Sequence, residues 1–292
     1  MRFLQCIVMV LIACSLNSCG LINTAYNNAP SLVSWWLDDY LDFSPAQTAL
    51  LNPALITLHD WHRQTQLPLY VSLLQDLQGT LAQAQFTPEV ACDKLDQMKS
   101  GFTTLQLQSV PIMLTMAPLI TEQQHTYLQK KLAERTQKWK KEWWPASTED
   151  QIEVRVEKAV DIAEKVYGGL SDAQRSMLAL GIKNSGIQPE LTYREILRRN
   201  QDIQQAIRAL QDTTLSTMQK SQHIQEGFAR FQHSPDPVYA AYAEQNKQRT
   251  CELIAEFHQH TNTQQKQHAQ NWLAGYIGQF SALAITKTAA KS

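Results

Sequence analysis

The chain has few of the sequence motifs that usually indicate an enzyme. Only 10 of its 292 residues are glycine, and none belongs to a glycine-rich nucleotide-binding loop. The G-x-S-x-G and H-E-x-x-H signatures of serine hydrolases and zinc proteases are also missing. Acid pairs such as Asp38-Asp39 are adjacent, so on a helix they point about 100° apart and suit concerted acid–base work poorly. We therefore expect a non-catalytic protein with no cofactor and no small-molecule substrate.

The chain also lacks an excess of charge of one sign. Its 26 lysines and arginines face 27 aspartates and glutamates, which gives a net charge of −1. Pairs such as Arg198-Arg199 are interpreted as ordinary solvated helix residues. Without a basic surface, nucleic acid is a poor partner. No apolar run reaches the eighteen residues of a membrane-spanning helix.

The first residues of the chain have the features of a secretory signal peptide. Arg2 supplies a positive start, Phe3 to Leu16 is mostly apolar, and the small residue Ser18 precedes Cys19. The ending resembles the lipobox of bacterial lipoproteins. This resemblance implies cleavage after Ser18 and acylation of Cys19, for instance by palmitate. Gly20, where aspartate would retain a lipoprotein in the inner membrane, implies an outer-membrane anchor with the protein on the periplasmic face.

Four segments follow from this interpretation. We expect a signal peptide at 1–18, a lipidated tether at 19–30, an all-helical periplasmic domain at 31–284 and a frayed tail at 285–292. A fully extended tether would span at most about 35–40 Å. The body is therefore expected to work close to its membrane.

Apolar residues recur at helical spacing through most of the chain. Two examples are the runs Leu69, Leu73, Leu77 and Leu81, and Ile196, Ile203, Ile207 and Leu210. Runs that alternate with period two are absent, and no low-complexity linker divides the chain. The sequence predicts an all-α, multi-helix body.

A short helix-start pattern, Ser or Thr three residues before Gln, occurs four times. Such a pair forms a capping box, in which the hydroxyl accepts from a backbone N–H and the Gln side chain reaches back. The direct role of this pattern is helix initiation. The positions of its four copies suggest that the chain consists of two related helical halves, Ser44 to Thr121 and Ser171 to Thr261. The four pairs are Ser44 and Gln47, Thr121 and Gln124, Ser171 and Gln174, and Thr261 and Gln264.

These repeats resemble the Leu-Thr-x-x-Gln helix starts of periplasmic proteins of the Spy and CpxP type. That resemblance implies an elongated or cradle-like helical body with chaperone-like activity. A longer block, Tyr26-Asn27-Asn28-Ala29 followed by Trp35-Trp36-Leu37-Asp38-Asp39-Tyr40 and Ser44-Pro45-Ala46-Gln47, resembles a proteobacterial lipoprotein family of unknown function. It implies fold and location but no activity.

Trp35, Trp36 and Tyr40 form an aromatic helix segment near the expected anchor. The rings either pack into the body or form a partner surface at the membrane, where Trp and Tyr are favoured. His59 and His62 share a helix face at a spacing that suits a metal, and a second, looser group is His258, His260 and His268. No carboxylate or cysteine completes either set, so we predict no metal site.

Two of the five cysteines, Cys6 and Cys14, lie in the signal peptide, and Cys19 is the expected lipid site. Cys92 and Cys251 remain, in a compartment that permits disulfides. They form either a disulfide between the two ends of the chain or two buried free thiols.

The functional expectation is a binding or interaction protein of the envelope, chaperone-like toward envelope proteins. A structural adaptor that docks one envelope partner is the alternative, and a metal carrier or enzyme is the weakest candidate. A large apolar concavity would favour the first of these.

Overall fold

The computed structural model describes residues 18–83 and 85–285, and these residues form helices, turns and loops without a strand. The all-α prediction is confirmed. Most of the expected signal peptide, residues 1–17, and most of the expected tail, 286–292, lie outside the described residues. Within the described ranges, no helix combines the length and the hydropathy needed to cross a bilayer.

The helices follow one another with short connections. In chain order they are α2 (Ser18–Asn27), α3 (Ala29–Leu41), α4 (Pro45–Trp61), a π-helical turn (His62–Gln66), α5 (Leu67–Leu81), α6 (Pro88–Gln108), α7 (Val110–Met116), a 3-10 turn (Ala117–Leu119), α8 (Glu122–Trp143), α9 (Thr148–Tyr167), α10 (Asp172–Lys183), α11 (Pro189–Gln211), α12 (Thr217–Gln232), α13 (Pro237–Gln259) and α14 (Thr263–Ile285).

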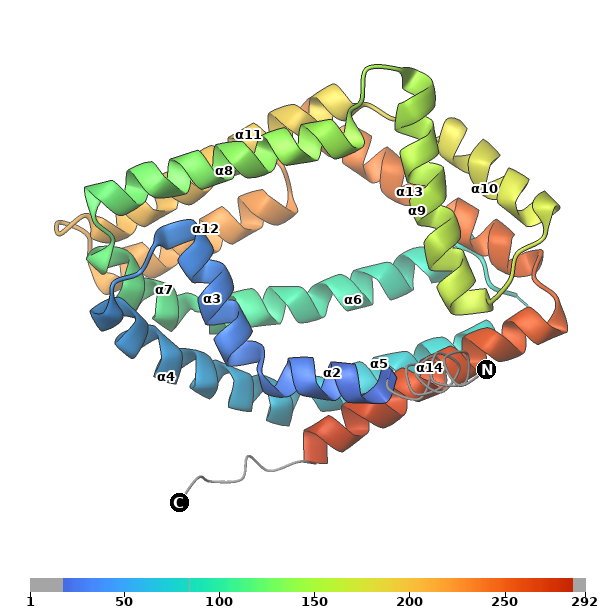
Figure 1. Cartoon of the computed structure of the whole chain (residues 1–292), viewed down its shortest axis with the longest axis horizontal. Coiled ribbons are helices and arrows are strands. Elements are labelled where there is room, and N and C mark those ends of the chain that lie inside the picture. The colour runs from blue at the N-terminus through green and yellow to red at the C-terminus, as the bar shows by residue number, and fades with distance from the viewer. Residues whose placement is uncertain (1–17, 84, 286–292) are drawn as a thin grey trace, which may run out of the picture.

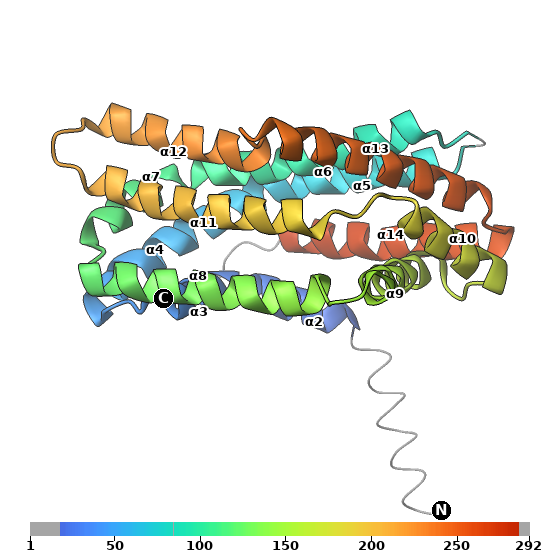
Figure 2. The ribbon, with the colours of Figure 1, turned by 90° about the horizontal axis from the view of Figure 1, so that it is seen from above.

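The helices lie along the sides of an elongated, open frame (Figure 1). One long side consists of α8 and α11, and the other of α5 and α14, which pack along each other. Helix α6 runs between these sides, with α13 packed on it (Figure 2). Helix α2 lies against α14, so the first and last described helices meet.

The segment expected as a tether is mostly helical. Helix α2 covers Ser18–Asn27, and α3 begins at Ala29. A ten-residue helix is about 15 Å long, less than half of the length that an extended chain would reach. Because α2 also packs on α14, Ser18, the first described residue, lies closer to the body than an extended segment would allow.

Two capped helix starts meet at one end of the frame through their glutamines. Gln47 and Gln124 sit at the third position of α4 and α8, and each amide oxygen accepts from the backbone N–H of its own cap, Ser44 or Thr121. The two side-chain amides also bond each other twice, Nε2 to Oε1, at 3.0 and 2.8 Å. The remaining Nε2 protons go to the carbonyls of Leu119 and Asp42, at 2.7 and 2.9 Å. Both amides are thus fully hydrogen-bonded although they are buried.

The opposite end of the frame repeats this arrangement with Gln174 and Gln265. Their amides bond each other at 2.8 and 2.9 Å. They also donate to the carbonyls of His260 and Gly169. In both pairs, each glutamine reaches the carbonyl two residues before its partner's cap.

The fourth capping box is one residue later than the sequence analysis placed it. Asn262 caps α14, and its side chain accepts from the backbone N–H of Gln265, whose amide oxygen accepts from the N–H of Asn262. Thr261 is buried and donates its hydroxyl to the carbonyl of His258 instead. The assignment to Thr261 and Gln264 is therefore wrong, because Asn caps a helix as well as Thr does.

The pairing of the caps agrees with the order of the suggested halves. Of the four helices whose cap glutamines are paired, α4 pairs with α8 and α10 pairs with α14. A further box, Ser216 with Gln219 at α12, is exposed and has no partner glutamine among the described residues.

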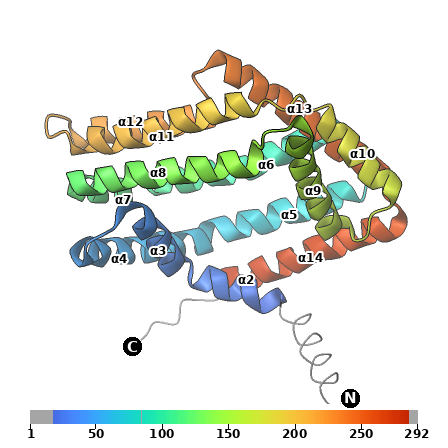
Figure 3. The ribbon, with the colours of Figure 1, turned by 45° about the horizontal axis from the view of Figure 1, so that its top comes forward.

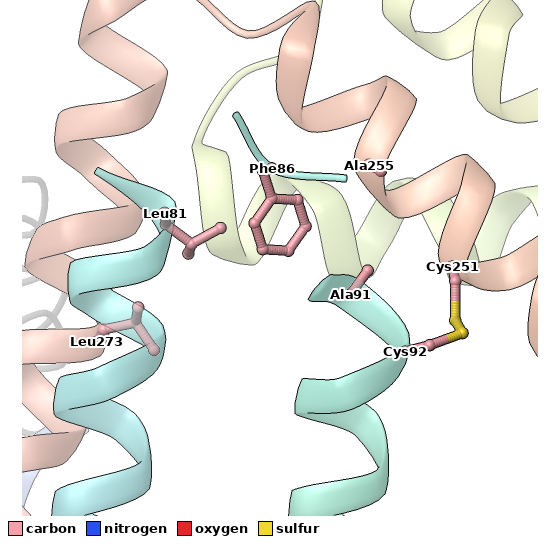
Figure 4. Close-up of a cluster of buried hydrophobic side chains, with 7 residues drawn as sticks. All are labelled: Leu81, Phe86, Ala91, Cys92, Cys251, Ala255 and Leu273. Carbon is pink, nitrogen blue, oxygen red and sulfur yellow. A yellow bond between two sulfur atoms is a disulfide. The ribbon is translucent and has the colours of Figure 1, made fainter. Parts of the chain in front are cut away.

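One hydrophobic cluster joins α5, α6, α13 and α14 and includes a disulfide (Figure 4). Cys92 of α6 and Cys251 of α13 are bonded, with Cα atoms 5.3 Å apart. Leu81, Phe86 and Leu273 belong to the same cluster as this bond. Of the two alternatives for the retained cysteines, the structure contains the disulfide.

Candidate functional site

A cavity of about 740 Å³ opens within the frame between α3, α4, α6, α7, α11 and α12. In Figure 3, α3, α4, α7 and α12 lie in one half of the frame, and α6 and α11 extend from that half toward the other. We call this space the apolar cavity, because its walls consist mainly of the side chains of Val33, Trp36, Leu37 and Leu41 (α3), Leu51, Leu55 and Leu58 (α4), Phe102 and Leu105 (α6), Ile112, Met113 and Met116 (α7), Ile203, Ala206, Ile207 and Leu210 (α11), and Ile224, Phe228 and Phe231 (α12).

The lining residues follow the helical period. On α11 the lining positions are 199, 202, 203, 206, 207 and 210, and on α12 they are 224, 227, 228 and 231. Spacings of three and four place these residues on one face of each helix. The same periodicity that predicts a core-facing helix therefore builds the walls of the cavity.

Several large apolar side chains in the walls are accessible to solvent. Trp36 is 49% exposed, Phe102 51% and Ile203 39%. A packed core would bury such residues, and folded proteins seldom leave so many apolar residues together in contact with water. The walls of the cavity therefore form a concave apolar surface.

The polar groups of the α4 wall are neutral, and one of their atoms, Nε2 of His59, is buried without a hydrogen-bond partner among the described residues. Tyr26 and His62 share a hydrogen bond of 2.8 Å between Oη and Nδ1, and the His59 ring packs 4.6 Å from the Tyr26 ring. Burial raises the pKa of Tyr26 to about 12, partly offset by Arg63. Burial also lowers the pKa of His59 and of His62, and Arg63 adds to the effect on His59. This wall therefore offers hydrogen-bonding groups but no charge at neutral pH.

A third histidine with a lowered pKa, His258, lies outside the cavity. Its Nδ1 lies 2.9 Å from the hydroxyl of Tyr167. Its Nε2 is buried and has no hydrogen-bond partner among the described residues. Burial is the main cause of the lowered pKa of His258, with the charge of Lys266 contributing.

These three histidines should make the protein less stable in mild acid. Their pKa is lower in the folded protein than the value of about 6.5 in an unfolded chain, so the unfolded state binds more protons below that pH. Stability is therefore complete above about pH 6.5 and falls as the pH drops toward the lowered values of the folded state. Urea unfolding at about pH 7.5 and about pH 5 measures this loss, and H258Q should reduce it while the exposed-site variant H260Q should not. An unchanged unfolding midpoint between the two pH values would contradict the expectation.

The α11 wall, in contrast, carries charge. Glu195 is buried and accepts hydrogen bonds from Arg198, Arg199 and Ser234. Burial alone would raise the pKa of Glu195, but these hydrogen bonds and the charge of Arg199 lower it overall. The sequence interpretation of Arg198 and Arg199 as solvated residues is wrong, because the side chains of both are largely enclosed, 17% and 28% exposed.

The aromatic segment expected as a partner surface is divided between two environments. Trp35 is 70% exposed, whereas Trp36 lines the apolar cavity and packs 5.0 Å from the ring of Tyr40. No residue of α3 is fully buried. Trp35 therefore does not pack into the body. The burial of the Cys19 side chain is outside what the structure describes.

The two histidine groups do not form metal sites with other side chains. His62 bonds Tyr26, His258 bonds Tyr167, and His268 bonds the carbonyl of Val166. Across residues 18–83 and 85–285, no three His, Cys, Asp or Glu residues are grouped so that they could hold a metal ion.

The sequence did not indicate the cavity or the contacts of Arg199. The helical period identifies apolar faces but not whether two faces touch or remain apart. The partners of Arg199 include Phe231, which is far away in the sequence. No local signal could have revealed this contact.

The chain matches one family model, over residues 39–219. This range includes α4, α6, α7, α8 and α11, and therefore much of the cavity wall, whereas Tyr26, Trp35 and Trp36 precede it. No curated protein and no solved structure matches the chain. The match covers more than half of the sequence, and the chain belongs to DUF6279, a family of unknown function.

Proposed function

We propose that the protein is a non-catalytic binding protein of the bacterial envelope that holds an apolar part of another molecule in the apolar cavity. The observation that carries this proposal is the concave, solvent-accessible wall built by the apolar faces of six helices. The cavity volume of about 740 Å³ is within the range of about 300–1,000 Å³ that is usual for ligand sites. A purely structural body would gain stability by packing these faces together.

The location is part of the same proposal. A lipobox at Cys19 would anchor the chain to the outer membrane on its periplasmic face. Helix α2 leads directly into α3, which forms one wall of the cavity. The anchor would thus keep the cavity close to the lipid surface, and the mass of the N-terminal peptide of the mature protein tests whether Cys19 is acylated.

A tryptophan at position 227 should block the cavity. Gly227 of α12 lines the cavity, and a Cβ added there meets no atom within 4 Å. An indole can therefore occupy the empty space without displacing the wall, and tryptophan is a better helix former than the glycine that it replaces. We expect G227W to bind the apolar dye N-phenyl-1-naphthylamine at least tenfold more weakly than the unmodified chain, as measured by dye fluorescence.

The matched control is G79W. Gly79 is also in a helix, is exposed and also has open space at its Cβ, but it does not line the cavity. Equal dye binding by the two variants would show that the dye binds elsewhere and would reject the proposed site.

A second candidate is an adaptor that docks one envelope protein on α3. The exposed indole of Trp35, outside the cavity, favours it. Photo-crosslinking in cells from position 35 tests this candidate: a single reproducible partner supports it, and the absence of any crosslinked protein opposes it.

A further inference from the structure

This inference rests on the proposed function and names the occupant of the cavity. We propose that the apolar cavity binds a single unbranched acyl chain whose anionic head group is held by Arg199. Two ligand classes share this chemistry, a free fatty acid and a lysophospholipid. Each combines one hydrocarbon tail with an anionic head group, a carboxylate in the first and a phosphate in the second. Three features of the site carry the proposal: its helical walls, its enclosure by apolar faces and the unused donors of Arg199.

The walls provide no backbone hydrogen bonds for a polypeptide. Nearly all lining residues lie in helices, where N–H and C=O groups are bonded within the helix. An extended peptide in the cavity would leave its own backbone groups unpaired, at a cost of several kcal/mol for each group in the least favourable case. An acyl chain has no such groups to satisfy.

The walls also suit a helical peptide poorly. An amphipathic helix has one apolar stripe and an opposite polar face. Apolar side chains of α3, α4, α7, α11 and α12 all line this cavity. A bound helix would therefore press its polar face against apolar side chains, whereas a hydrocarbon tail is apolar all round.

Arg199 supplies a binding group for an anion at the wall of the cavity. Its Nε donates to Glu195 at 2.8 Å, and its guanidinium lies 4.3 Å from the centre of the Phe231 ring. Both contacts fix the position of the guanidinium group. Among the described residues, neither Nη group of Arg199 has a hydrogen-bond partner, so a planar pair of donors remains for a carboxylate or phosphate.

The charged groups around Arg199 are not balanced, and one more anion would neutralise them. Within the described part of the chain, three arginines share only two carboxylates; the members of this network are Arg198, Arg199, Arg230, Glu195 and Asp202. The network therefore carries one excess positive charge. Asp202 also lines the cavity, but both of its oxygens accept from the network. Arg194, next to Glu195 in the sequence, is balanced by its own partner, Asp236.

A second arginine near the cavity is already engaged. Both Nη groups of Arg63 donate to the protein, one to the carbonyl of Leu283 and one to the side chain of Asn27. The α4 wall near it is otherwise neutral. Arg199 is thus the group in the walls that is arranged to receive a head group.

The test compares ligands with the same tail and different head groups. The protein used is the chain from Ser18 onward with Cys19→Ser, which keeps every described helix and carries no lipid of its own. Displacement of N-phenyl-1-naphthylamine is measured with myristate, myristoyl-lysophosphatidylglycerol, zwitterionic myristoyl-lysophosphatidylcholine and neutral monomyristoylglycerol, all below their aggregation limits. We expect at least one anionic ligand to bind about tenfold or more tightly than neutral monomyristoylglycerol. The tighter of the two anionic ligands shows whether the natural ligand is a free fatty acid or a lysophospholipid.

The variant R199Q should abolish this preference, whereas R208Q should preserve it. Arg208 is on the same helix but is exposed and paired with Glu122 outside the cavity. Binding of monomyristoylglycerol to R199Q should remain within about twofold, which excludes collapse of the cavity. Shorter fatty acids should lose about fourfold in affinity per methylene removed, the factor that corresponds to burial of one CH₂.

The outcomes separate this inference from the proposed function. Equal binding of anionic and neutral ligands, or an anion preference that survives R199Q, overturns the inference but leaves the cavity as a binding site. Failure of G227W to weaken binding of the dye and of every lipid rejects the proposed function itself. Displacement of the dye by unfolded protein but by no lipid would overturn the inference in favour of a polypeptide client.

Discussion

Replacing Gln124 by leucine is expected to lower the free energy of unfolding by about 2–4 kcal/mol. The substitution preserves much of the side-chain volume but removes two of the four hydrogen bonds of the buried Gln47 amide, which keeps only those with Ser44 and Leu119. It also takes away the Gln124 partner of the Asp42 carbonyl and of the Thr121 N–H. Each buried group that loses its hydrogen bond costs about 1–3 kcal/mol. Urea unfolding of Q124L, followed by circular dichroism, measures the loss.

The control for this prediction is Q219L. Gln219 occupies the same capping-box position on α12, but it is exposed and bonds only to Ser216 among the described residues. Its replacement removes only the side-chain half of the capping box, since the hydroxyl of Ser216 still accepts from the backbone N–H of residue 219, so the cost should stay near about 1 kcal/mol or below. A similar loss in both variants would mean that the glutamine pair adds nothing to ordinary capping.

Removal of the disulfide should lower the free energy of unfolding by about 2–5 kcal/mol. Cys92 and Cys251 are separated by 159 residues, and the loop-closure model gives about 5 kcal/mol for a loop of that length. The bond joins α6 to α13, so without it these two helices are held together by packing and by polar contacts such as the ion pair between Lys247 and Asp96. The measurement is urea unfolding of the double variant C92A/C251A.

Unfolding of the unmodified chain in the presence of a thiol reductant provides the control. The reduced chain and the double variant should unfold at similar urea concentrations, and reductant should have no effect on the variant. Equal stability of the oxidised chain and the variant would show that the native bond places no constraint on the unfolded state.

Local sequence signals predicted the helices because periodicity and capping act over a few residues. The spacing of Leu69, Leu73, Leu77 and Leu81 corresponds to α5, and Ser44 and Gln47 cap α4 as expected. The error at Thr261 is also local, since Asn262 competes for the same role one residue later.

Contacts between distant residues could not be predicted in the same way. Gln47 and Gln124 are 77 residues apart, and their capping boxes alone do not indicate that the two amides meet. Likewise, the period of Ile203, Ile207 and Leu210 predicts an apolar face but not that the face borders an open cavity. The position of Arg199 over Phe231 depends on the packing of α11 against α12, which only the folded chain defines.

The two glutamine pairs have a consequence for how the frame responds to its surroundings. A primary amide neither gains nor loses a proton over the ordinary range of pH, and a neutral pair attracts no counterions. The contacts between helix starts at the two ends are therefore insensitive to acidity and ionic strength, whereas the histidines near α4 and the arginine network on α11 respond to one or both. The contacts at the two ends of the frame thus stay the same while the electrostatic interactions at the walls of the apolar cavity change with pH and ionic strength.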